Sequence, residues 1–508
     1  MFSFSNKPDY IKPKLKMEQN KPKGNSSAFF TLTIVFFFWG FVAASNDILI
    51  PVFKEKLHLQ QWQSQMISFA FYVAYTVGAI IYSFVSKLIG GDILNKLGYK
   101  NGIVLGLIIS TIGALMFYPA AQTASFALLI GGLFVIGLGY SLQQTAANPL
   151  AIIMGSPKTG SQRLNLAGGV NNFGTTIGPV LVSLAIFGSV TAKTHIASIE
   201  SVKYPYLVLG ALFILVAIIF KFSSVPNKIE HITDEEPISS PTDTSPIKAP
   251  AVVRKNALKY TQLALGMIAI FVYVGVEVST ASNLPAYMKD KLHTPTSDIA
   301  PFVSLYWASL MIGRWTASVG AFNLSGGWRK LLNILMPYIA FGVFLAINAL
   351  AQRDVTPFYV YALVIIVMIA GDMLSKGNPA RQLLISSVLA ITALMIGMLT
   401  HGYLSVYAFI SVGLFCSTLW PSIYALAIAG LGIHTNEGSG YLIMMIMGGG
   451  VISLLQGYLA SPNLLGIQFS YIVGVACFAY LAFYAVKVKR VLINQGIDFD
   501  ALETGAAH

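Results

Sequence analysis

The sequence predicts an all-α polytopic membrane protein built from two repeated six-helix bundles, with one additional helical hairpin. Of its 508 residues, 55% are hydrophobic and only 10% are charged, whereas soluble domains average about 25% charged residues. Continuous apolar runs of about 17 to 25 residues recur from Phe29 to Val488, and each can cross a hydrocarbon core of about 30 Å. Because these runs are continuous and not alternating, they predict helices and not strands.

The first bundle is predicted to cover residues 29–222, after a basic, proline-containing cytoplasmic tail at residues 1–28. Its apolar runs are separated by short segments that contain glycine, proline or charged residues. The predicted helices cover about Phe29–Phe53, Ser64–Leu88, Gly102–Pro119, Ser125–Met154, Leu164–Phe187 and Tyr204–Phe222.

A change of composition separates the two bundles. Residues 223–257 are rich in Pro, Ser, Thr and charge, which predicts a flexible cytoplasmic linker. The second bundle is predicted at residues 258–490, followed by a cytoplasmic tail at residues 491–508. Its helices cover about Leu258–Met288, Ile299–Phe322, Lys330–Leu350, Phe358–Leu374, Gln382–Leu399, Leu404–Gly430, Gly440–Leu459 and Phe469–Val488.

This second bundle contains two more apolar runs than the first. Two extra crossings return the chain to the same side of the membrane, so an inserted hairpin leaves the orientation of all other helices unchanged. The segment SKGNPARQ has the basic character expected ahead of the ordinary ninth helix. We therefore predict an insertion at about residues 330–376 and about 14 transmembrane helices in total.

The distribution of positive charge predicts the orientation. The net charge is +12, and lysines are concentrated before the first apolar run and after the last. If both termini are cytoplasmic, most of the 32 Lys and Arg residues fall on the cytoplasmic side, as the positive-inside rule requires. The charge therefore does not call for a nucleic-acid partner. Cys416 and Cys477 lie in apolar runs and are expected to act as small hydrophobic side chains.

Several amide side chains lie inside the two apolar runs between Tyr140 and Pro179. They are Gln143, Gln144, Asn148, Asn171 and Asn172. An unpaired amide in such a place costs roughly 2 to 7 kcal/mol. Amides that converge from two helices can bind a polyhydroxylated solute, because each offers donors and acceptors. The alternative is hydrogen bonding between helices, with Gly168 and Gly169 allowing close packing. For the cluster as a whole we favour a cavity.

Two acidic residues lie deep in the apolar runs that open the two bundles. Asp47 precedes Pro51, and Glu277 precedes Pro285. An ionisable side chain inside a membrane is costly, so it is a functional candidate by default. The alternative for Asp47 is a structural salt bridge or a helix cap, and for Glu277 it is pairing with a neighbouring helix.

The two bundles also share an interrupted helix. The segments AANPLAIIMG and TLWPSIYALAIAG each carry a proline within an apolar run, and each is followed by a glycine-rich run. Repeated six-helix halves with interrupted helices at their interface are typical of secondary transporters of the major facilitator type.

The sequence moreover resembles the fucose:proton symporter family of the major facilitator superfamily, which consists of sugar permeases of bacterial inner membranes. The resemblance is carried by FFFWGFVAASNDILIP, TAANP, RLNLAGGVNNFG, YVGVEVS, MIGRW and WPSIYALAIAGLG, which are spread over most of residues 29–488. It implies that Asp47 takes the place of an essential carboxylate in the first helix, and Asn171 that of an amide that contacts the sugar. It also implies a location in the bacterial inner membrane.

Two residues depart from the family's pattern. Gln144 stands where the fucose permease has a protonatable Glu, and Gly168 stands where it has Gln. Because Gln144 cannot titrate, a relay of two carboxylates in the first bundle is not available. Relatives that carry glucose, galactose or N-acetylglucosamine look similar in using an amide near this position and an acid corresponding to Glu277. The resemblance thus implies a hexose or amino sugar other than fucose.

We predict that the sugar binds near the mid-plane, between helices of both bundles. The predicted contacts are the amides Gln144, Asn148, Asn171 and Asn283, with Trp39, Trp307 and Trp420 as candidates for its apolar face. Each Trp also fits packing or an interfacial anchor.

Coupling to a cation requires an acid whose charge is tolerated only with a bound ion. Asp47 either carries a proton, because burial raises a carboxyl pKa, or stays ionised and binds sodium together with Asn46 and Gln143. Glu277 is the second candidate coupling acid. The sequence does not choose between proton and sodium.

Asp92, Lys96, Lys100 and Arg314 are predicted to hold the bundles together on the cytoplasmic side, although a solvated basic flank also explains the lysines. Neither a metal-ligand spacing nor a catalytic constellation is present, so we expect no metal, no cofactor and no enzyme activity. A sugar uniporter, a transporter of another small polar solute and a transport-inactive receptor are the alternatives. We expect a monomer whose partners are a monosaccharide and the lipid bilayer.

Overall fold

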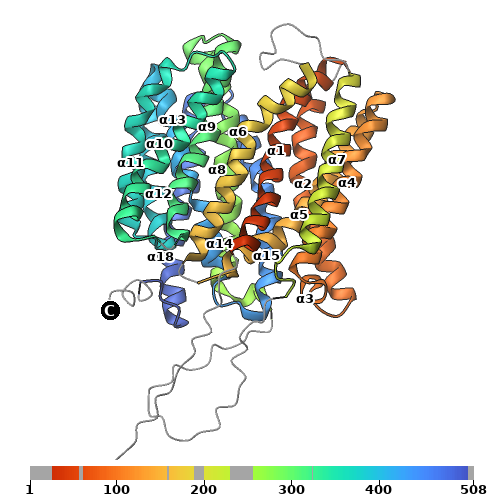
Figure 1. The fold of residues 1–508 in the computed structure, drawn as a ribbon. Helices are drawn as coiled ribbons and strands as arrows, with labels where there is room; N and C mark the ends of the chain where they lie inside the picture. The colour runs from red at the N-terminus through yellow and green to blue at the C-terminus, as the bar shows by residue number, and fades with distance from the viewer. Residues whose placement is uncertain are drawn as a thin grey trace, which may run out of the picture.

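The computed structural model describes residues 26–56, 61–156, 159–187, 199–228, 256–322 and 324–500, and its regular elements in these ranges are all helices. The helices stand side by side in two groups (Figure 1). Within the described residues, 11 helices are long and apolar enough to cross a membrane. This confirms the helical membrane fold class. The predicted total of fourteen crossings is not established by these eleven.

The first group contains seven helices. They are α1 (Ser26–Lys56), α2 (Gln61–Leu88), the short α3 (Ile93–Leu97), α4 (Tyr99–Gln122), α5 (Phe126–Ile153), α6 (Gly160–Phe187) and α7 (Ile199–Phe222). Within this group α1 packs against α6, and α4 packs between α5 and α7.

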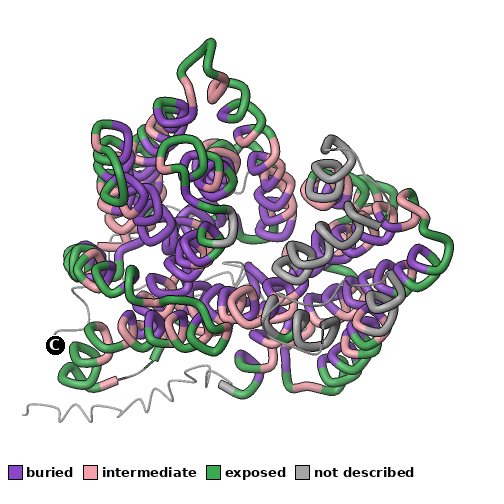
Figure 2. Tube along the Cα trace, turned by 90° about the horizontal axis from the view of Figure 1, so that it is seen from above, coloured by how far each residue is buried: buried purple, intermediate pink, exposed green. Residues whose placement is uncertain are grey.

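The second group follows the linker. Its helices are α8 (Thr261–Leu292), α9 (Thr296–Ser318), α10 (Gly326–Leu350), α11 (Tyr361–Ser375), α12 (Pro379–Leu399), α13 (Gly402–Cys416), α14 (Leu419–Ile428), α15 (Thr435–Met444), α16 (Gly448–Leu459), α17 (Gly466–Phe469) and α18 (Ile472–Asn494). Here α8 packs against α14, α16 and α18, and α12 packs against α13 and α18. Figure 2 shows buried residues on the faces that the helices of each group turn toward one another.

Three helices that we expected to cross the membrane are not among the eleven. In α1 the apolar stretch that the structure describes is short, Ser27–Val42. The helices α6 and α9 carry polar residues, and they pack against each other where the two groups meet. Polar side chains at such a contact lower the mean hydropathy of α9, whereas the apolar end of α6, residues 182–187, belongs to a part of that helix whose side chains lie outside the described residues.

The predicted inserted hairpin corresponds to α10 and α11, which lie at the outer edge of the second group (Figure 1). There α10 contacts α9 and α11, while α11 contacts α12 and α13. A 3₁₀ turn, η4 (Thr356–Val360), precedes α11. That this pair is an insertion stays a prediction.

Two predicted helices of the second bundle are interrupted in the structure. The run expected at Leu404–Gly430 is divided into α13 and α14 around Ser417 and Thr418. The run expected at Gly440–Leu459 begins earlier, at Thr435, and is divided into α15 and α16 by the 3₁₀ turn η6 (Met445–Met447). The polar residues ahead of Gly440 suggested a loop, but they form the first turns of α15.

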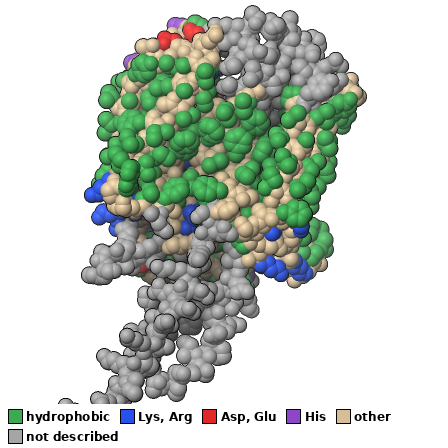
Figure 3. All heavy atoms as spheres, viewed as in Figure 1, with side chains coloured by type: hydrophobic (Ala, Val, Ile, Leu, Met, Phe, Trp, Pro, Cys, Tyr) green, Lys and Arg blue, Asp and Glu red, His purple; other side chains and the backbone are tan. Residues whose placement is uncertain are grey.

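Charged side chains gather at the two ends of the molecule, with a broad hydrophobic band between them (Figure 3). Lys and Arg side chains lie at the lower end of this view, where Figure 1 shows α3 and the end of α18. We call this end, which contains α3, the start of α15 and the end of α18, the basic end.

A short segment after α18 folds back onto the basic end. Asp500 pairs with Arg381 at the start of α12 (2.9 Å) and with Lys489 of α18 (2.6 Å). The hydrogen bond from Lys489 holds the pKa of Asp500 below its usual value. Asp500 also accepts a hydrogen bond from Asn378, the residue that caps α12. This segment therefore fixes the turn between α11 and α12.

Pro149 leaves one backbone carbonyl of α5 without its helical hydrogen-bond donor, and a side chain of the second group supplies a donor instead. A proline has no N–H, so the carbonyl of Thr145, four residues earlier, loses its helical partner. Ser439 of α15 donates its hydroxyl to this carbonyl (2.7 Å). Tyr424 in turn hydrogen-bonds Ser439. A proline-freed carbonyl of one group is thus satisfied by a side chain of the other.

We predict that Ser439→Ala lowers stability, because it leaves the buried Thr145 carbonyl without a donor, a loss of roughly 1 to 3 kcal/mol. In a Pro149→Ala background the loss should be smaller, because an alanine at this position supplies the missing N–H. The measurement is the apparent melting temperature of the four variants of this double-mutant cycle in nanodiscs.

Ser453→Ala is the matched control, since Ser453 donates only to Gly449 of its own helix (2.6 Å). If Ser439→Ala destabilises both backgrounds equally, the Thr145 carbonyl is not what Ser439 stabilises.

Candidate functional site

Arg314 of α9 connects the two groups of helices. Its Nη1 donates to the side-chain oxygen of Asn172 on α6 (2.6 Å) and, at 3.4 Å, to the carbonyl of Gly168. Its Nε donates to the carbonyl of Ser417 (3.0 Å). Pro421 cannot supply the N–H that this carbonyl would otherwise accept. The guanidinium thus satisfies a second proline-freed carbonyl and an amide of the opposite group.

Glu277 of α8 lies beside this guanidinium. Arg314 attracts the Glu277 carboxylate, which also accepts a hydrogen bond from Tyr273. At 3.5 Å, Arg314 Nη2 reaches the Tyr273 hydroxyl. The second carboxylate oxygen, Oε2, is buried and has no hydrogen-bond partner among the described residues. It can therefore accept a hydrogen bond from a solute hydroxyl, take up a proton or contact a cation.

Two glycines of α6 make room for side chains of α9. A Cβ atom at Gly168 would lie 3.2 Å from Arg314 Cδ, and one at Gly169 would lie 2.6 Å from Trp315 Cδ1. Trp315 also donates to the Gly169 carbonyl (3.1 Å). For this pair the structure supports the close-packing interpretation, and it explains Gly168 as the position that admits Arg314.

The predicted amides of the first bundle lie in separate helix contacts. Gln144 donates to the Tyr75 hydroxyl on α2 (3.1 Å), whereas Asn171 donates to the Phe36 carbonyl on α1 (3.0 Å). Asn148 is 2% exposed, and its Nδ2 has no partner among the described residues. Direct contacts therefore do not bring these amides together, and Asn148 keeps an unused donor.

Gln143 is packed inside the first group. It accepts a hydrogen bond from the Trp39 indole (2.9 Å) and donates to the Ser110 hydroxyl (3.0 Å). Its side chain is 0% exposed and that of Trp39 is 5% exposed. Trp39 and Gln143 thus make a helix contact in this structure, and their predicted roles with sugar and cation stay predictions.

The remaining predicted contacts come from the second group. Asn283 donates to the carbonyl one turn earlier in its own helix (2.8 Å). The Trp420 ring lies 6.3 Å from that of Tyr273, next to Glu277, while Trp307 packs edge-on against Tyr306. Of the three tryptophans, Trp420 lies beside Arg314, Glu277 and Tyr273, which we call the Arg314 cluster. Asn46 and Asp47 belong to a part of α1 whose side chains lie outside the described residues.

The predicted gating residues of the α2–α4 connection contact their own group. Asp92 caps α3 by accepting from two backbone N–H groups, and its burial raises its pKa. Lys96 donates to the carbonyl of Ile89, and Lys100 to that of Ser223 (3.3 Å). Both lysines thus donate hydrogen bonds to backbone carbonyls of the first group. A role in gating stays a prediction for Asp92, Lys96 and Lys100.

Another pair joins the groups at the basic end, and sequence reasoning did not identify it. Asn436 of α15 donates to the side-chain oxygen of Asn95 on α3 (2.5 Å). Together with Ser439, this places the polar first turns of α15 against the first group. In the sequence, the segment TNEGSG could have indicated this contact, because polar residues directly before an apolar run are typical of the start of a helix.

Among the described residues, no group of three or more His, Cys, Asp or Glu side chains could hold a metal ion.

Arg314→Lys is expected to weaken the contact between α6 and α9. A lysine keeps the charge, but it cannot hold the Ser417 carbonyl and Asn172 together as the planar guanidinium does. Asn172→Ala should then add little to Arg314→Lys, with a coupling of about 0.5 to 3 kcal/mol. Apparent melting temperatures of the single and double variants measure this coupling.

The exposed Arg490→Lys serves as the charge-matched control for this cycle. Strict additivity of Arg314→Lys and Asn172→Ala would contradict the assigned contact.

Comparisons with known proteins agree with this architecture. Residues 28–375 match the family model described as Major Facilitator Superfamily. A glucose/galactose transporter of Brucella abortus is 34% identical over 474 residues, covering 93% of this chain and 96% of the relative. The L-fucose-proton symporter of Escherichia coli is 26% identical over 477 residues, covering 90% and 92%.

A crystal structure of the Escherichia coli fucose:proton symporter is similar in fold, with a TM-score of 0.66 at 23% identity over 91% of this chain and 98% of that chain. Its similarity supports the helical arrangement described above. The chain therefore belongs to the major facilitator superfamily, among the relatives of the glucose/galactose transporters and L-fucose-proton symporters.

Proposed function

We propose that this protein is a secondary active transporter that imports a monosaccharide, a hexose or an amino sugar, by cation symport across a bacterial inner membrane. The observation that carries the proposal is the unpartnered, buried carboxylate oxygen of Glu277 beside Arg314, where the two groups meet. The name of the Brucella abortus relative supports the substrate class, and that of the Escherichia coli symporter supports coupling to protons.

Coupling follows from the charges around Arg314. Glu277 and Arg314 belong to the same group, so the charged carboxylate competes with Asn172 of the other group for the guanidinium. When Glu277 gains a proton, this competition falls and the contact between α6 and α9 strengthens, whereas loss of the proton favours the separation of the two groups that alternating access requires. Asp47 is the second coupling acid in this proposal, with Asn46 and Gln143 as ligands if the ion is sodium.

The sugar contacts in this proposal are the amides Gln144, Asn148, Asn171 and Asn283. The unused donor of Asn148 supports a ligand with acceptor oxygens. Both termini lie in the cytoplasm, in agreement with the cationic side chains at the basic end (Figure 3). The helices α1, α6 and α9 complete fourteen crossings, with α10 and α11 as the inserted pair, and the protein is a monomer.

A sugar uniporter is the second candidate. The attraction between Arg314 and Glu277 favours it, because a carboxylate that is neutralised by a permanent cation needs no transported ion.

The two candidates are separated by uptake into proteoliposomes. Labelled glucose, galactose, N-acetylglucosamine and fucose are supplied with an inward proton gradient, an inward sodium gradient or neither. Symport predicts accumulation above the external concentration with one gradient only. Equilibration at the same rate in all three conditions would leave the uniporter, and no uptake of any sugar would reject sugar transport.

Asp47→Asn should abolish gradient-driven accumulation while sugar exchange at equilibrium continues, because the amide cannot ionise yet keeps the size and hydrogen-bonding groups of the carboxyl. The readout is counterflow alongside gradient-driven uptake. Asp354→Asn, at an exposed turn before η4, is the charge-matched control. Full accumulation by Asp47→Asn would remove this residue from the coupling site.

A further inference from the structure

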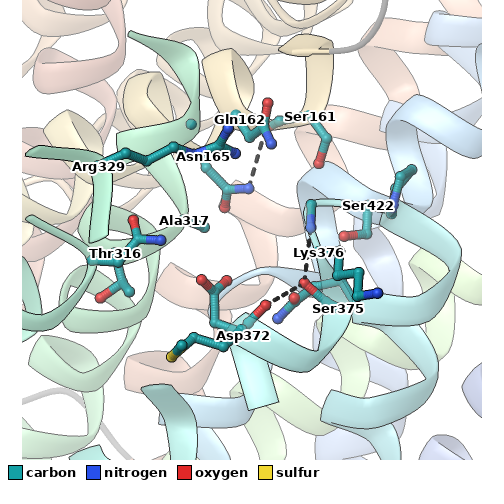
Figure 4. Close-up of a pocket in the computed structure, with 16 residues that line it drawn as sticks. Ser161, Gln162, Asn165, Thr316, Ala317, Arg329, Asp372, Ser375, Lys376 and Ser422 are labelled. Carbon is teal, nitrogen blue, oxygen red and sulfur yellow. Dashed lines mark hydrogen bonds between the residues drawn. The ribbon is translucent and has the colours of Figure 1, made fainter. Parts of the chain in front are cut away.

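A cavity of about 320 Å³ opens at the basic end, and the predicted sugar contacts are not among the described residues that line it. It lies between α6 of the first group and α9, α10, α11, α12 and α14 of the second (Figure 4). One water molecule takes up about 30 Å³ of liquid, so the space is far larger than a single bridging water needs. Its size is at the lower end of typical small-molecule sites, about 300 to 1,000 Å³.

Several polar atoms of the wall lack a protein partner. Gln162 Oε1, Asn165 Oδ1 and Ser422 Oγ are buried and have no hydrogen-bond partner among the described residues. Asn165 is 3% exposed and Ser422 is 1% exposed. The amide nitrogen of Asn165 is already used by the Ser161 carbonyl (3.1 Å), which leaves its oxygen for the cavity. Buried polar atoms are rarely left unpaired, so these atoms indicate a ligand that supplies hydrogen-bond donors.

The charged side chains that line the cavity indicate which chemical class of ligand it can bind. Asp372 and Arg329 come from different helices, α11 and α10, and both side chains point into the space (Figure 4). Lys376 adds a second cation. The carboxylate and the unpaired amide oxygens disfavour an anion, whereas Arg329 and Lys376 disfavour a cation. A neutral solute with many hydroxyls fits, because each hydroxyl can both donate and accept.

The cavity is built by both groups of helices. Gln162 of α6 reaches between Gly320 and Gly377, where an added Cβ atom at either glycine would lie 2.7 Å from its Nε2. Gly377 has a φ of +77°, a conformation that favours glycine. The adjoining turn is fixed by Asn378 and its bond to Asp500. A ligand in this space therefore contacts both groups at once.

A separate, much smaller space of about 10 Å³ lies next to this cavity. It shares Asp372 and Gln382 with the larger cavity and extends to Ser417. The carbonyl of Ser417 accepts the Arg314 Nε hydrogen bond. Ser417 is thus shared by the smaller space and the Arg314 contact between α6 and α9.

We propose that this cavity is a second monosaccharide site, reached from the basic end and separate from the predicted transport site. Asp372 and Arg329 hold sugar hydroxyls, and Gln162, Asn165 and Ser422 complete the hydrogen bonds. Because both groups line it, bound sugar favours the arrangement seen here and slows turnover as sugar accumulates on this side. The inference rests on the proposed sugar transport but concerns a different site.

The test uses a cysteine placed in the wall. Met373 lines the cavity and is 56% exposed, while the native Cys416 and Cys477 are buried. In the Met373→Cys protein, a membrane-impermeant maleimide added at the basic end should label the new thiol. The sugar transported best in the uptake panel should slow this labelling severalfold. Ile433→Cys, also exposed at the basic end, is the control whose labelling should not change.

Second-site variants identify where the protecting sugar binds. Asp372→Asn should abolish the protection of Met373→Cys by sugar. Asn165→Ala should weaken this protection, and it is the variant to use if Asp372→Asn does not fold. Asn171→Ala, at the predicted transport site, should leave protection in place. Uptake is measured in the same proteoliposomes, so a loss of transport is seen independently of protection.

Three results would overturn the second site. The first is normal uptake with no protection by any concentration of sugar. The second is protection that survives Asp372→Asn and Asn165→Ala but is lost in Asn171→Ala, which would assign it to the transport site. The third is equal protection by inorganic phosphate, which would indicate an anion site. Absence of uptake of every sugar would instead reject the transport proposal.

Discussion

The contact between the two groups of helices depends on backbone carbonyls that proline leaves without a donor. Inside a membrane no water is available to such a carbonyl, so a side chain has to supply the hydrogen bond. Ser439 does so for Thr145, and Arg314 does so for Ser417. In the first case the donor belongs to the opposite group, and in the second the same guanidinium also binds Asn172 of the opposite group. Each of the two prolines thereby marks a point of contact between the groups, although α5 runs unbroken past Pro149 and only the second-group run is divided into two helices.

Glycine makes these recognition points possible. Gly168 and Gly169 allow Arg314 and Trp315 to reach the backbone of α6. Gly320 and Gly377 leave space for Gln162 in a comparable way at the basic end. In a lipid environment, where apolar surfaces gain little from leaving the solvent, close backbone approach and hydrogen bonds provide much of the helix association.

The polar side chains of the membrane region fall into two kinds. Gln143, Gln144 and Asn171 use their amides on neighbouring helices, and they stabilise the first group. Glu277 and Asn148, like the cavity residues Gln162, Asn165 and Ser422, keep buried atoms that have no hydrogen-bond partner among the described residues. The second kind offers hydrogen-bonding atoms that the described part of the fold does not satisfy.

The sequence by itself determined the class of fold, because long continuous apolar runs have no stable alternative to helices in lipid. It also singled out Glu277 and the two prolines within apolar runs, since buried charge and mid-run proline are costly wherever they occur. Only the tertiary structure decided the partners: that Arg314 lies between Glu277 and Asn172, that Gln144 and Asn171 belong to different helix contacts, and that Asn436 and Ser439 reach the first group. The physical reason is that a hydrogen-bonding side chain is satisfied by any suitable neighbour, and which neighbour it meets depends on the packing of helices that are far apart in the chain.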